Sequence, residues 1–184
     1  MNWKKIVLII FGILGIIVLL FGGFIGYIYY ERLGRYPTNT AKYPHEIGYI
    51  NPETSEFSEG FELCDSSLKP FGYYHSARGI FNGEKYQFRK TISEKYTNNG
   101  YTDSGFVNVR FLLNCNGKVG NVEINELNTD YEKTDLNDEL VDQLVTLSIA
   151  KQNWIPKEIE GKTYDSYMYL IFKIEDGEVL EILP

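Results

Sequence analysis

Two cysteines and two histidines are the residues of this 184-residue chain whose side chains are best suited to bind a metal or to act as a nucleophile and its base. They are Cys64, Cys115, His45 and His75, and none stands in a metal-binding spacing such as His-x-x-x-His or Cys-x-x-Cys. A Cys64 thiol activated by His75 would be a nucleophile if the fold brought the two together. No Gly-x-Ser-x-Gly, P-loop or dinucleotide-binding motif accompanies them. We therefore expect no catalytic group, metal or cofactor, with a Cys64/His75 enzyme as the alternative.

An uninterrupted apolar segment lies near the N-terminus. Residues 6–30 contain no charge, proline, Asn or Gln, and as a helix they would be ~37 Å long at ~1.5 Å per residue. That length crosses a hydrocarbon core of ~30 Å. The segment is too long for a cleaved signal peptide, and no small-residue cleavage site follows it. We predict an uncleaved signal anchor that forms a single transmembrane helix.

The charges beside this segment predict its orientation. Lys4 and Lys5 precede it, whereas the two arginines that follow it are partly offset by Glu31. By the positive-inside rule the N-terminus is then cytoplasmic. We expect residues 1–5 in the cytoplasm and the remainder beyond the inner, cytoplasmic membrane, in the periplasm.

Glycines recur along one face of the predicted membrane helix. Gly15, Gly22 and Gly26 share that face, and the last two form a Gly-x-x-x-Gly motif. Such a stripe allows close approach of two helices, which favours a homodimer through the membrane helix. The alternative is that glycine is simply common in membrane helices.

The exported part divides at residue 60. Residues 31–60 hold three prolines among Gly, Asn, Thr and Ser with little apolar periodicity, which predicts a linker. Residues 61–184 form the predicted domain. After Arg35 the chain has 14 basic and 24 acidic residues, a net charge of −10, which opposes binding to phosphate backbones. We expect no nucleic-acid partner.

A hairpin is predicted in the first half of the domain. Apolar residues alternate with polar ones from residue 107 to residue 115, the period of a half-buried strand. Asn116-Gly117 follows and is typical of a two-residue type I′ turn. Such a turn would place Cys115 opposite Lys118 and Leu113 opposite Gly120.

Two helices and a second hairpin complete the predicted domain. Apolar residues four apart predict a helix over 84–96, and leucines at spacings of three and four predict another over 136–147. Residues 164–174 alternate as a long strand, and Asp176-Gly177 predicts a tight turn into a last strand. The expected fold class is α+β, an antiparallel sheet with two helices on one face.

The order of these motifs resembles the C-terminal domain of the TonB family. The matching segments are Gly105-Phe-Val-Asn-Val-Arg-Phe111, Asn116-Gly117-Lys118-Val119, Trp154-Ile155-Pro156 and the closing strand over 170–174. In that family a G-x-V-x-V-x-F strand leads to a D-G-x-V turn, a helix ends in W-x-P, and a final strand closes the sheet. The resemblance covers roughly residues 78–183 and extends to a Bacteroidetes-like branch with a Cys before the domain.

The resemblance implies an inner-membrane anchor and a periplasmic domain that adds a strand to a short peptide of an outer-membrane transporter. True energy transducers also have a Ser and a His in the membrane helix and a long Pro-rich spacer. Residues 6–30 contain neither Ser nor His, and residues 31–60 contain only three prolines. We therefore expect binding of another envelope protein as the function, with energy transduction for outer-membrane transport as the alternative.

Two surfaces are candidates for this binding. The last predicted strand can stay unpaired on one side and accept an added strand; its residues are Val179, Leu180, Glu181, Ile182 and Leu183. Tyr167 and Tyr169 lie on the sheet face opposite the apolar one, where tyrosines can form a binding surface. A partly exposed strand also favours tyrosine without any binding role.

The two cysteines are expected to form a disulfide. Cys115 ends the first strand of the predicted hairpin, and Cys64 lies in the segment that leads into the domain. An oxidising periplasm permits the bond, and closing a loop of about 50 residues would restrict the unfolded chain by roughly 4 kcal/mol. The alternatives are two buried free thiols and a bond between subunits.

Overall fold

The computed structural model describes residues 2–34, 39, 41–42, 44–45, 48–72 and 80–183. By its internal contacts the chain divides into two units, Met1–Ile47 and Gly48–Pro184, and the second is called the body below. Residues 48–60 thus belong to the body, where Ile50 is buried. The structure starts the body at Gly48, inside the segment that was predicted as a linker.

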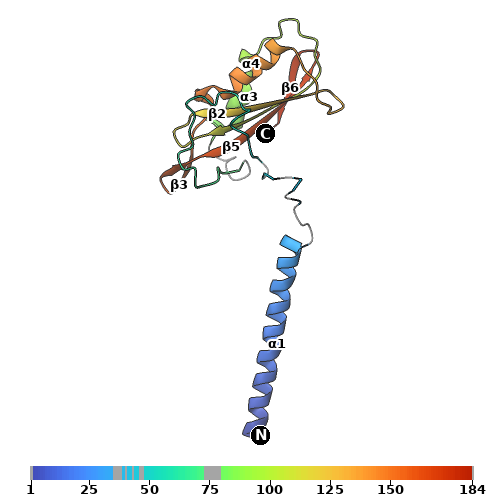
Figure 1. Ribbon diagram of the computed structural model, residues 1–184, viewed down its shortest axis with the longest axis vertical. Coiled ribbons are helices and arrows are strands. Elements are labelled where there is room, and N and C mark those ends of the chain that lie inside the picture. Colours follow the sequence, from blue (N-terminus) through green and yellow to red (C-terminus); the bar gives the residue numbers. More distant parts are fainter. Residues whose placement is uncertain are drawn as a thin grey trace. The chain divides into compact units, whose positions relative to one another are not determined.

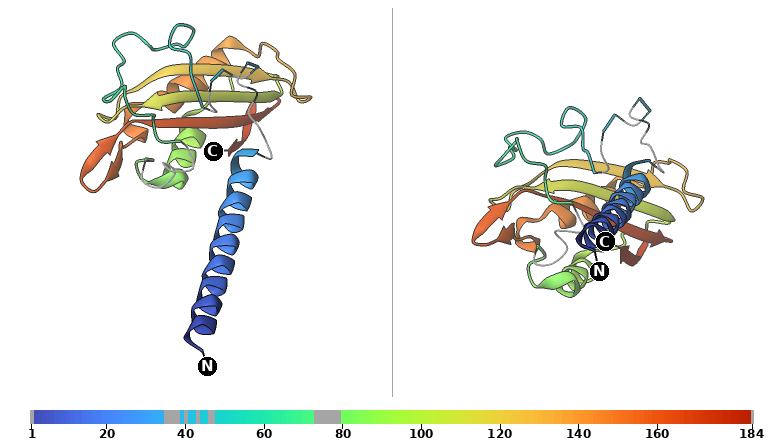
Figure 2. Two further views of the ribbon diagram at one scale, coloured as in Figure 1. Left: turned by 60° about the horizontal axis from the view of Figure 1, so that its bottom comes forward. Right: turned by 90° about the horizontal axis from the view of Figure 1, so that it is seen from below.

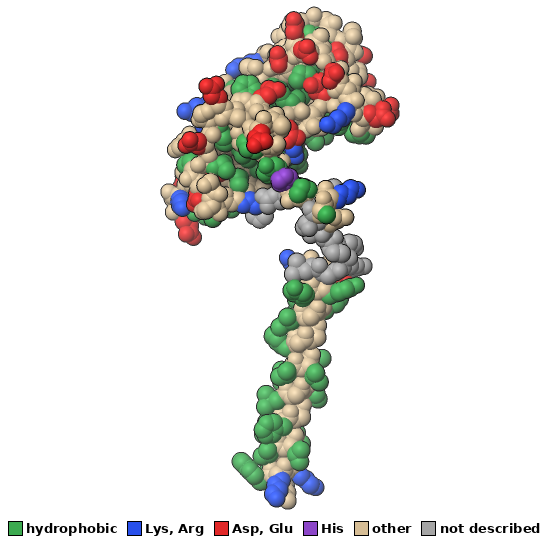
Figure 3. All heavy atoms as spheres, in the orientation of Figure 1, with side chains coloured by type: hydrophobic (Ala, Val, Ile, Leu, Met, Phe, Trp, Pro, Cys, Tyr) green, Lys and Arg blue, Asp and Glu red, His purple; other side chains and the backbone are tan. Residues whose placement is uncertain are grey.

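A long apolar helix is the main element of the first unit. Helix α1 spans Trp3–Tyr29, and one π-helical turn over Tyr30–Gly34 follows it. Its length is about 40 Å at ~1.5 Å per residue, against ~30 Å for a hydrocarbon core. None of its residues is buried, and Figure 3 shows hydrophobic side chains along its whole length. The helix is long and apolar enough to span a membrane once.

A four-stranded antiparallel sheet is the centre of the body, in the order β2-β1-β5-β6 (Figure 1). These strands are β1 Gly105–Leu113, β2 Val119–Leu127, β5 Ser166–Glu175 and β6 Glu178–Leu183. A separate hairpin joins β3 Lys157–Ile159 to β4 Lys162–Tyr164. Since β2 and β6 end the row, the predicted edge residues Val179–Leu183 lie within an edge strand of the sheet.

Two helices cover one face of the sheet: α3 Glu84–Lys95 and α4 Asp138–Ile149. Figure 2 shows both on the same side of the strands. The start of α4 is fixed by Asn137, whose side chain accepts a hydrogen bond from the N–H of Leu140 at 3.2 Å, the usual role of an N-cap residue. The predicted α+β arrangement is confirmed.

The core lies between these helices and the sheet. Alternate residues of β1 and β5 are completely or almost completely buried there; they are Val107, Val109, Phe111, Leu113, Met168, Leu170, Phe172 and Ile174. Trp154 packs against Phe81, Phe88 and Phe111 with ring centroids 4.9, 5.4 and 5.0 Å away. Its Nε1 donates to the carbonyl of Ser148 at 2.7 Å, so its one polar group is satisfied inside the core.

The β1–β2 hairpin has the predicted register only away from its turn. Val109 faces Ile124, as two-residue pairing requires. Leu113 faces Val119 and not Gly120, so the predicted pairing beside the turn is wrong. The predicted register returns from the pair of Arg110 and Glu123 onward, because a one-residue slip carried along β2 would exchange the faces of its side chains.

The side chain of Asn114 explains this difference. Its Oδ1 accepts hydrogen bonds from the backbone N–H groups of Asn116 and Lys118, both at 3.0 Å. The backbone N–H of Asn114 donates to the Lys118 carbonyl at 2.9 Å. Lys118 therefore pairs with Asn114 and not with Cys115, which lies in a three-residue loop. Asn121, with φ of 49°, is the extra residue of a β-bulge that restores the register.

Residues 48–72, the lead-in segment, run over the other face of the sheet (Figure 2). Glu56 and Val122 exchange two backbone hydrogen bonds of 2.8 Å on the open side of β2. Phe71 donates to the carbonyl of Asp165 and accepts from the N–H of Tyr167, both at 2.9 Å. The lead-in segment is thus attached to the sheet by backbone hydrogen bonds.

Candidate functional site

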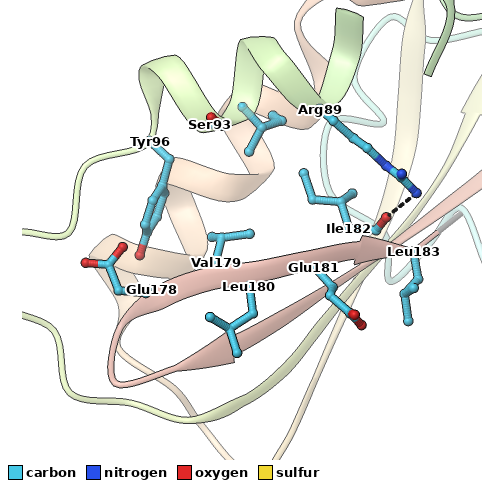
Figure 4. Close-up of a pocket in the computed structure, with 10 residues that line it drawn as sticks. Arg89, Ser93, Tyr96, Glu178, Val179, Leu180, Glu181, Ile182 and Leu183 are labelled. Carbon is cyan, nitrogen blue, oxygen red and sulfur yellow. Dashed lines mark hydrogen bonds between the residues drawn. The ribbon is translucent and has the colours of Figure 1, made fainter. Parts of the chain in front are cut away.

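A groove of about 480 Å³ lies between helix α3 and strand β6 (Figure 4). All five residues of the predicted edge line it, together with Glu178 at the start of the strand. Its helical wall consists of Arg89, Ile92, Ser93 and Tyr96. The structure thus adds a helix to the edge that the sequence indicated.

The helical wall follows from the periodicity of α3. Phe88 and Ile92 are buried in the core, and the next residues along the chain, Arg89 and Ser93, are exposed. Residues four apart share one face of a helix, so Arg89 and Ser93 lie side by side at the border of the core. Figure 4 shows both above β6.

The main chain of β6 has an open side that faces this groove. Ile182 pairs with Phe172 of β5, yet its carbonyl accepts a hydrogen bond from Nη2 of Arg89 at 3.0 Å. In an antiparallel strand the N–H and C=O of one residue point to the same side. Both backbone groups of Ile182 therefore point away from β5, and Arg89 binds the acceptor.

The side chains of β6 divide between the two sides of the sheet. Val179 and Ile182 point toward α3, whereas Leu180, Glu181 and Leu183 point away from it (Figure 4). Leu180 is 50% exposed and Leu183 is 41% exposed. Large exposed apolar side chains beside open backbone groups are features of a docking edge.

The two ends of the groove differ in charge. Arg89 supplies a cation beside Ile182, and Glu178 supplies a carboxylate at the turn into the strand, where it accepts a hydrogen bond from Nδ2 of Asn98 at 3.1 Å. Burial raises the pKa of Tyr96 to about 12, and the negative charge of Glu178 adds to this effect. Tyr96 is therefore a neutral donor, and its hydroxyl donates to the carbonyl of Gly177 at 2.6 Å.

Tyr167 and Tyr169, the other predicted binding residues, lie on the face of the sheet away from the helices. Their ring centroids are 6.3 Å apart. Tyr167 is half-buried next to Gly48 of the lead-in segment; its burial raises the pKa of its hydroxyl, while the charge of Arg110 opposes the shift. Arg110 itself forms an ion pair with Glu123 across β1 and β2. This face is thus partly covered, and its Arg110 is paired with Glu123.

Cys64 and Cys115 form a disulfide, as predicted. The bond lies beside a second hollow, of about 390 Å³, that Phe71 and Tyr164 also line. In the described part of the chain, the one close group of potential metal ligands joins these two cysteines to Asp165. Sulfurs in a disulfide are not thiolates and bind no metal in this form. For the same reason Cys64 is not a nucleophile here, and His75 lies outside the described residues.

The glycines of the membrane helix face open space within this single chain. A Cβ atom added at Gly15, Gly22 or Gly26 would meet no atom within 4 Å. That space is compatible with the close approach of a second helix.

Sequence reasoning did not find Arg89, Ser93 and Tyr96. Arg89 and Ser93 directly follow the apolar residues Phe88 and Ile92, and Tyr96 lies four residues after Ile92. This spacing places the three side chains at the edge of the buried face of the helix, and it was the signal available in the sequence. The sequence around the helix does not show that β6 lies next to that edge.

Comparisons with protein-family models, with curated proteins and with solved structures give no match for this chain.

Proposed function

We propose that the protein is a membrane-anchored module that binds an extended segment of another envelope protein by adding it to β6 as a further strand. The observation that supports this function is the outward orientation of the Ile182 backbone into the groove. Backbone hydrogen bonds supply affinity in such complexes, and the neighbouring side chains supply selectivity. The function needs no catalytic group.

The β6 edge is favoured over the other surfaces of the sheet. Glu56 already forms backbone hydrogen bonds with Val122 on the open side of β2. The face with Tyr167 is partly covered by the lead-in segment, and its Arg110 has Glu123 as partner. Among the described residues, no strand pairs with the outer side of β6.

Helix α1 would hold this module in the inner membrane, with the N-terminus in the cytoplasm and the body in the periplasm. Lys4 and Lys5 before the helix favour that orientation. The disulfide is chemically compatible with an oxidising periplasm. The resemblance to the TonB C-terminal domain makes an outer-membrane transporter one partner of the required kind.

Photocrosslinking with the full chain in intact cells tests this function. A photoreactive amino acid replaces Leu180 or Leu183 beside the open edge, or Tyr131, which is 70% exposed after β2 and serves as the control position. We expect crosslinked products from positions 180 and 183 but not from position 131. The variant Ile182→Pro removes the outward N–H and should abolish the products.

The same experiment can contradict the proposal. Equal products from position 131 would show that crosslinking is unrelated to the edge. Products that persist in an Ile182→Pro protein with its disulfide and secondary structure intact would show that the partner does not pair with β6.

A further inference from the structure

We propose that Arg89 selects the partner of β6: the bound segment carries a side-chain carboxylate opposite Ile182, and Arg89 pairs with it on binding. This inference rests on the proposed function and adds the chemistry of the partner.

A strand that pairs with β6 competes with Arg89 for the Ile182 carbonyl. Nη2 of Arg89 now donates to that carbonyl at 3.0 Å, so the guanidinium occupies part of the path along the open edge. An added strand would lie about 4.8 Å from β6 and would direct its own N–H groups at the same acceptor. Binding therefore displaces Arg89 from Ile182.

The displaced guanidinium needs an acceptor that the groove does not supply. Two carboxylates line the groove in the described part of the chain, those of Glu178 and Glu181. Glu181 points away from α3 (Figure 4), and Glu178 lies four residues from Ile182, about 13 Å along a strand. An arginine beside a newly buried strand pairs best with a carboxylate. The partner must bring that group.

Glu178 restricts where the partner can be acidic. Its carboxylate at the other end of the groove, with Glu175 opposite it in β5, repels a second acidic side chain and attracts a basic one. The segment is thus acidic near Arg89 and neutral or basic about four residues away. A side-chain carboxylate reaches Arg89 whichever way the strand runs, whereas a C-terminal carboxylate does so in one direction only. We therefore assign the carboxylate to a side chain.

Selection from a library of random eight-residue peptides, displayed with neither end of the random segment free, tests this inference. The targets are the full chain in detergent micelles and its Arg89→Glu, Lys90→Glu and Ile182→Pro variants. Lys90→Glu is the matched control, because it makes the same change of charge at the next residue, which is 49% exposed outside the groove.

We expect the wild-type protein to enrich peptides with Asp or Glu at one fixed position, and Arg89→Glu to enrich Lys or Arg there. Lys90→Glu should keep the wild-type preference. Changing that Glu to Gln in one selected peptide should weaken its binding to the wild-type protein roughly tenfold, and the loss should shrink at high salt. The same change should not weaken binding to Arg89→Glu.

The outcomes separate this inference from the proposed function. Peptides that require the Ile182 edge but show no acidic preference, and bind Arg89→Glu equally well, overturn the inference and leave the function standing. Absence of peptides that distinguish the wild-type protein from Ile182→Pro overturns both. If Ile182→Pro does not fold, the criterion becomes slower hydrogen exchange of the Ile182 amide in the wild-type protein with peptide bound.

Discussion

The carboxylate of Asp165 accepts the backbone N–H of Cys115 through Oδ1 at 2.9 Å. Its Oδ2 accepts the N–H groups of Cys64 at 2.9 Å and of Asp65 at 3.2 Å. One buried side chain therefore holds both halves of the disulfide, although the two cysteines are 51 residues apart in the sequence. It fixes their backbones independently of the covalent bond.

Asp165→Asn should lower the free energy of unfolding by roughly 1.5–3 kcal/mol. An amide offers one oxygen, and its NH₂ group would face one of the three donors, so at least one part-buried N–H loses its partner. Urea denaturation measures the change. Asp65→Asn is the matched control, because Asp65 is exposed and accepts locally from Ser67. Equal losses in the two variants would contradict the role of Asp165.

Removing the disulfide should have the larger effect. Replacing Cys64 and Cys115 by Ser should lower the free energy of unfolding by roughly 4 kcal/mol, because the unfolded chain regains the freedom of a loop of about 50 residues. Thiol labelling of the denatured, unreduced wild-type protein should find no reactive thiol in a monomer. An unchanged urea midpoint in the double variant would contradict the predicted stabilisation.

Three Gly-containing turns show what the sequence could predict. Asp176-Gly177 was predicted as a tight hairpin turn, and this is confirmed: Glu175 pairs with Glu178, and both turn residues have the positive φ of a type I′ turn, 49° and 73°. Glu160-Gly161 has the same signs, at 51° and 78°, and joins β3 to β4. It was not predicted, because Glu rarely adopts a positive φ.

The third turn, at Asn116-Gly117, was predicted as type I′ and is not, since only Gly117 has a positive φ. Locally, Oδ1 of Asn114 accepts from the N–H groups of Asn116 and Lys118 and closes a three-residue loop. Distant residues hold this loop: the N–H of Cys115 donates to Asp165, and its sulfur bonds to Cys64. The local pattern does not contain these distant contacts. The register was correct beyond the bulge because the alternation of buried residues decided it there.

The strand of the candidate site was predictable from the sequence, whereas the approach of helix α3 to that strand was not. The apolar pattern of Val179–Leu183 after a turn indicated a final strand that could stay unpaired on one side. The approach of Arg89 to Ile182 depends on how α3 crosses the sheet, which is set by packing of the whole core. Residues 48–60 were assigned to a linker because backbone hydrogen bonds such as those of Glu56 leave no apolar period in the sequence.

The two faces of β1 should respond differently to truncation. Phe111→Ala should lower the free energy of unfolding by roughly 3–5 kcal/mol, because Phe111 is 0% exposed and packs against Trp154. Asn108→Ala on the other face should cost less than about 1 kcal/mol. Urea denaturation compares them, and equal costs would be incompatible with a core on the helix side only.

The orientation of α1 is testable with reporters fused to the C-terminus of the full chain. A reporter active only outside the cytoplasm should be active, because Lys4 and Lys5 retain the N-terminus inside. A reporter active only in the cytoplasm should be inactive at the same position. The reverse pattern would overturn the proposed periplasmic location and, with it, the class of partner.

The contribution of the Tyr96 hydroxyl to the free energy of unfolding should fall at alkaline pH. The pKa of Tyr96 is raised to about 12 in the folded chain, whereas an unfolded tyrosine titrates near pH 10. Below pH 10 both states hold the proton, and the hydrogen bond to Gly177 contributes in full, about 1 kcal/mol. Between pH 10 and 12 the unfolded state loses its proton first, so the contribution falls.

Tyr96→Phe isolates this contribution from the titration of other tyrosines and lysines. The wild-type protein should be the more stable of the two at pH 8, and its advantage should disappear as the pH rises from 10 to 12, in urea denaturation series at each pH. Tyr86→Phe serves as the control for the loss of a tyrosine hydroxyl, because Tyr86 is 75% exposed on α3 and its substitution should leave the free energy of unfolding at pH 8 almost unchanged. A Tyr96→Phe difference that stays constant up to pH 12 would mean that the hydroxyl at the mouth of the groove does not hold the β5–β6 turn.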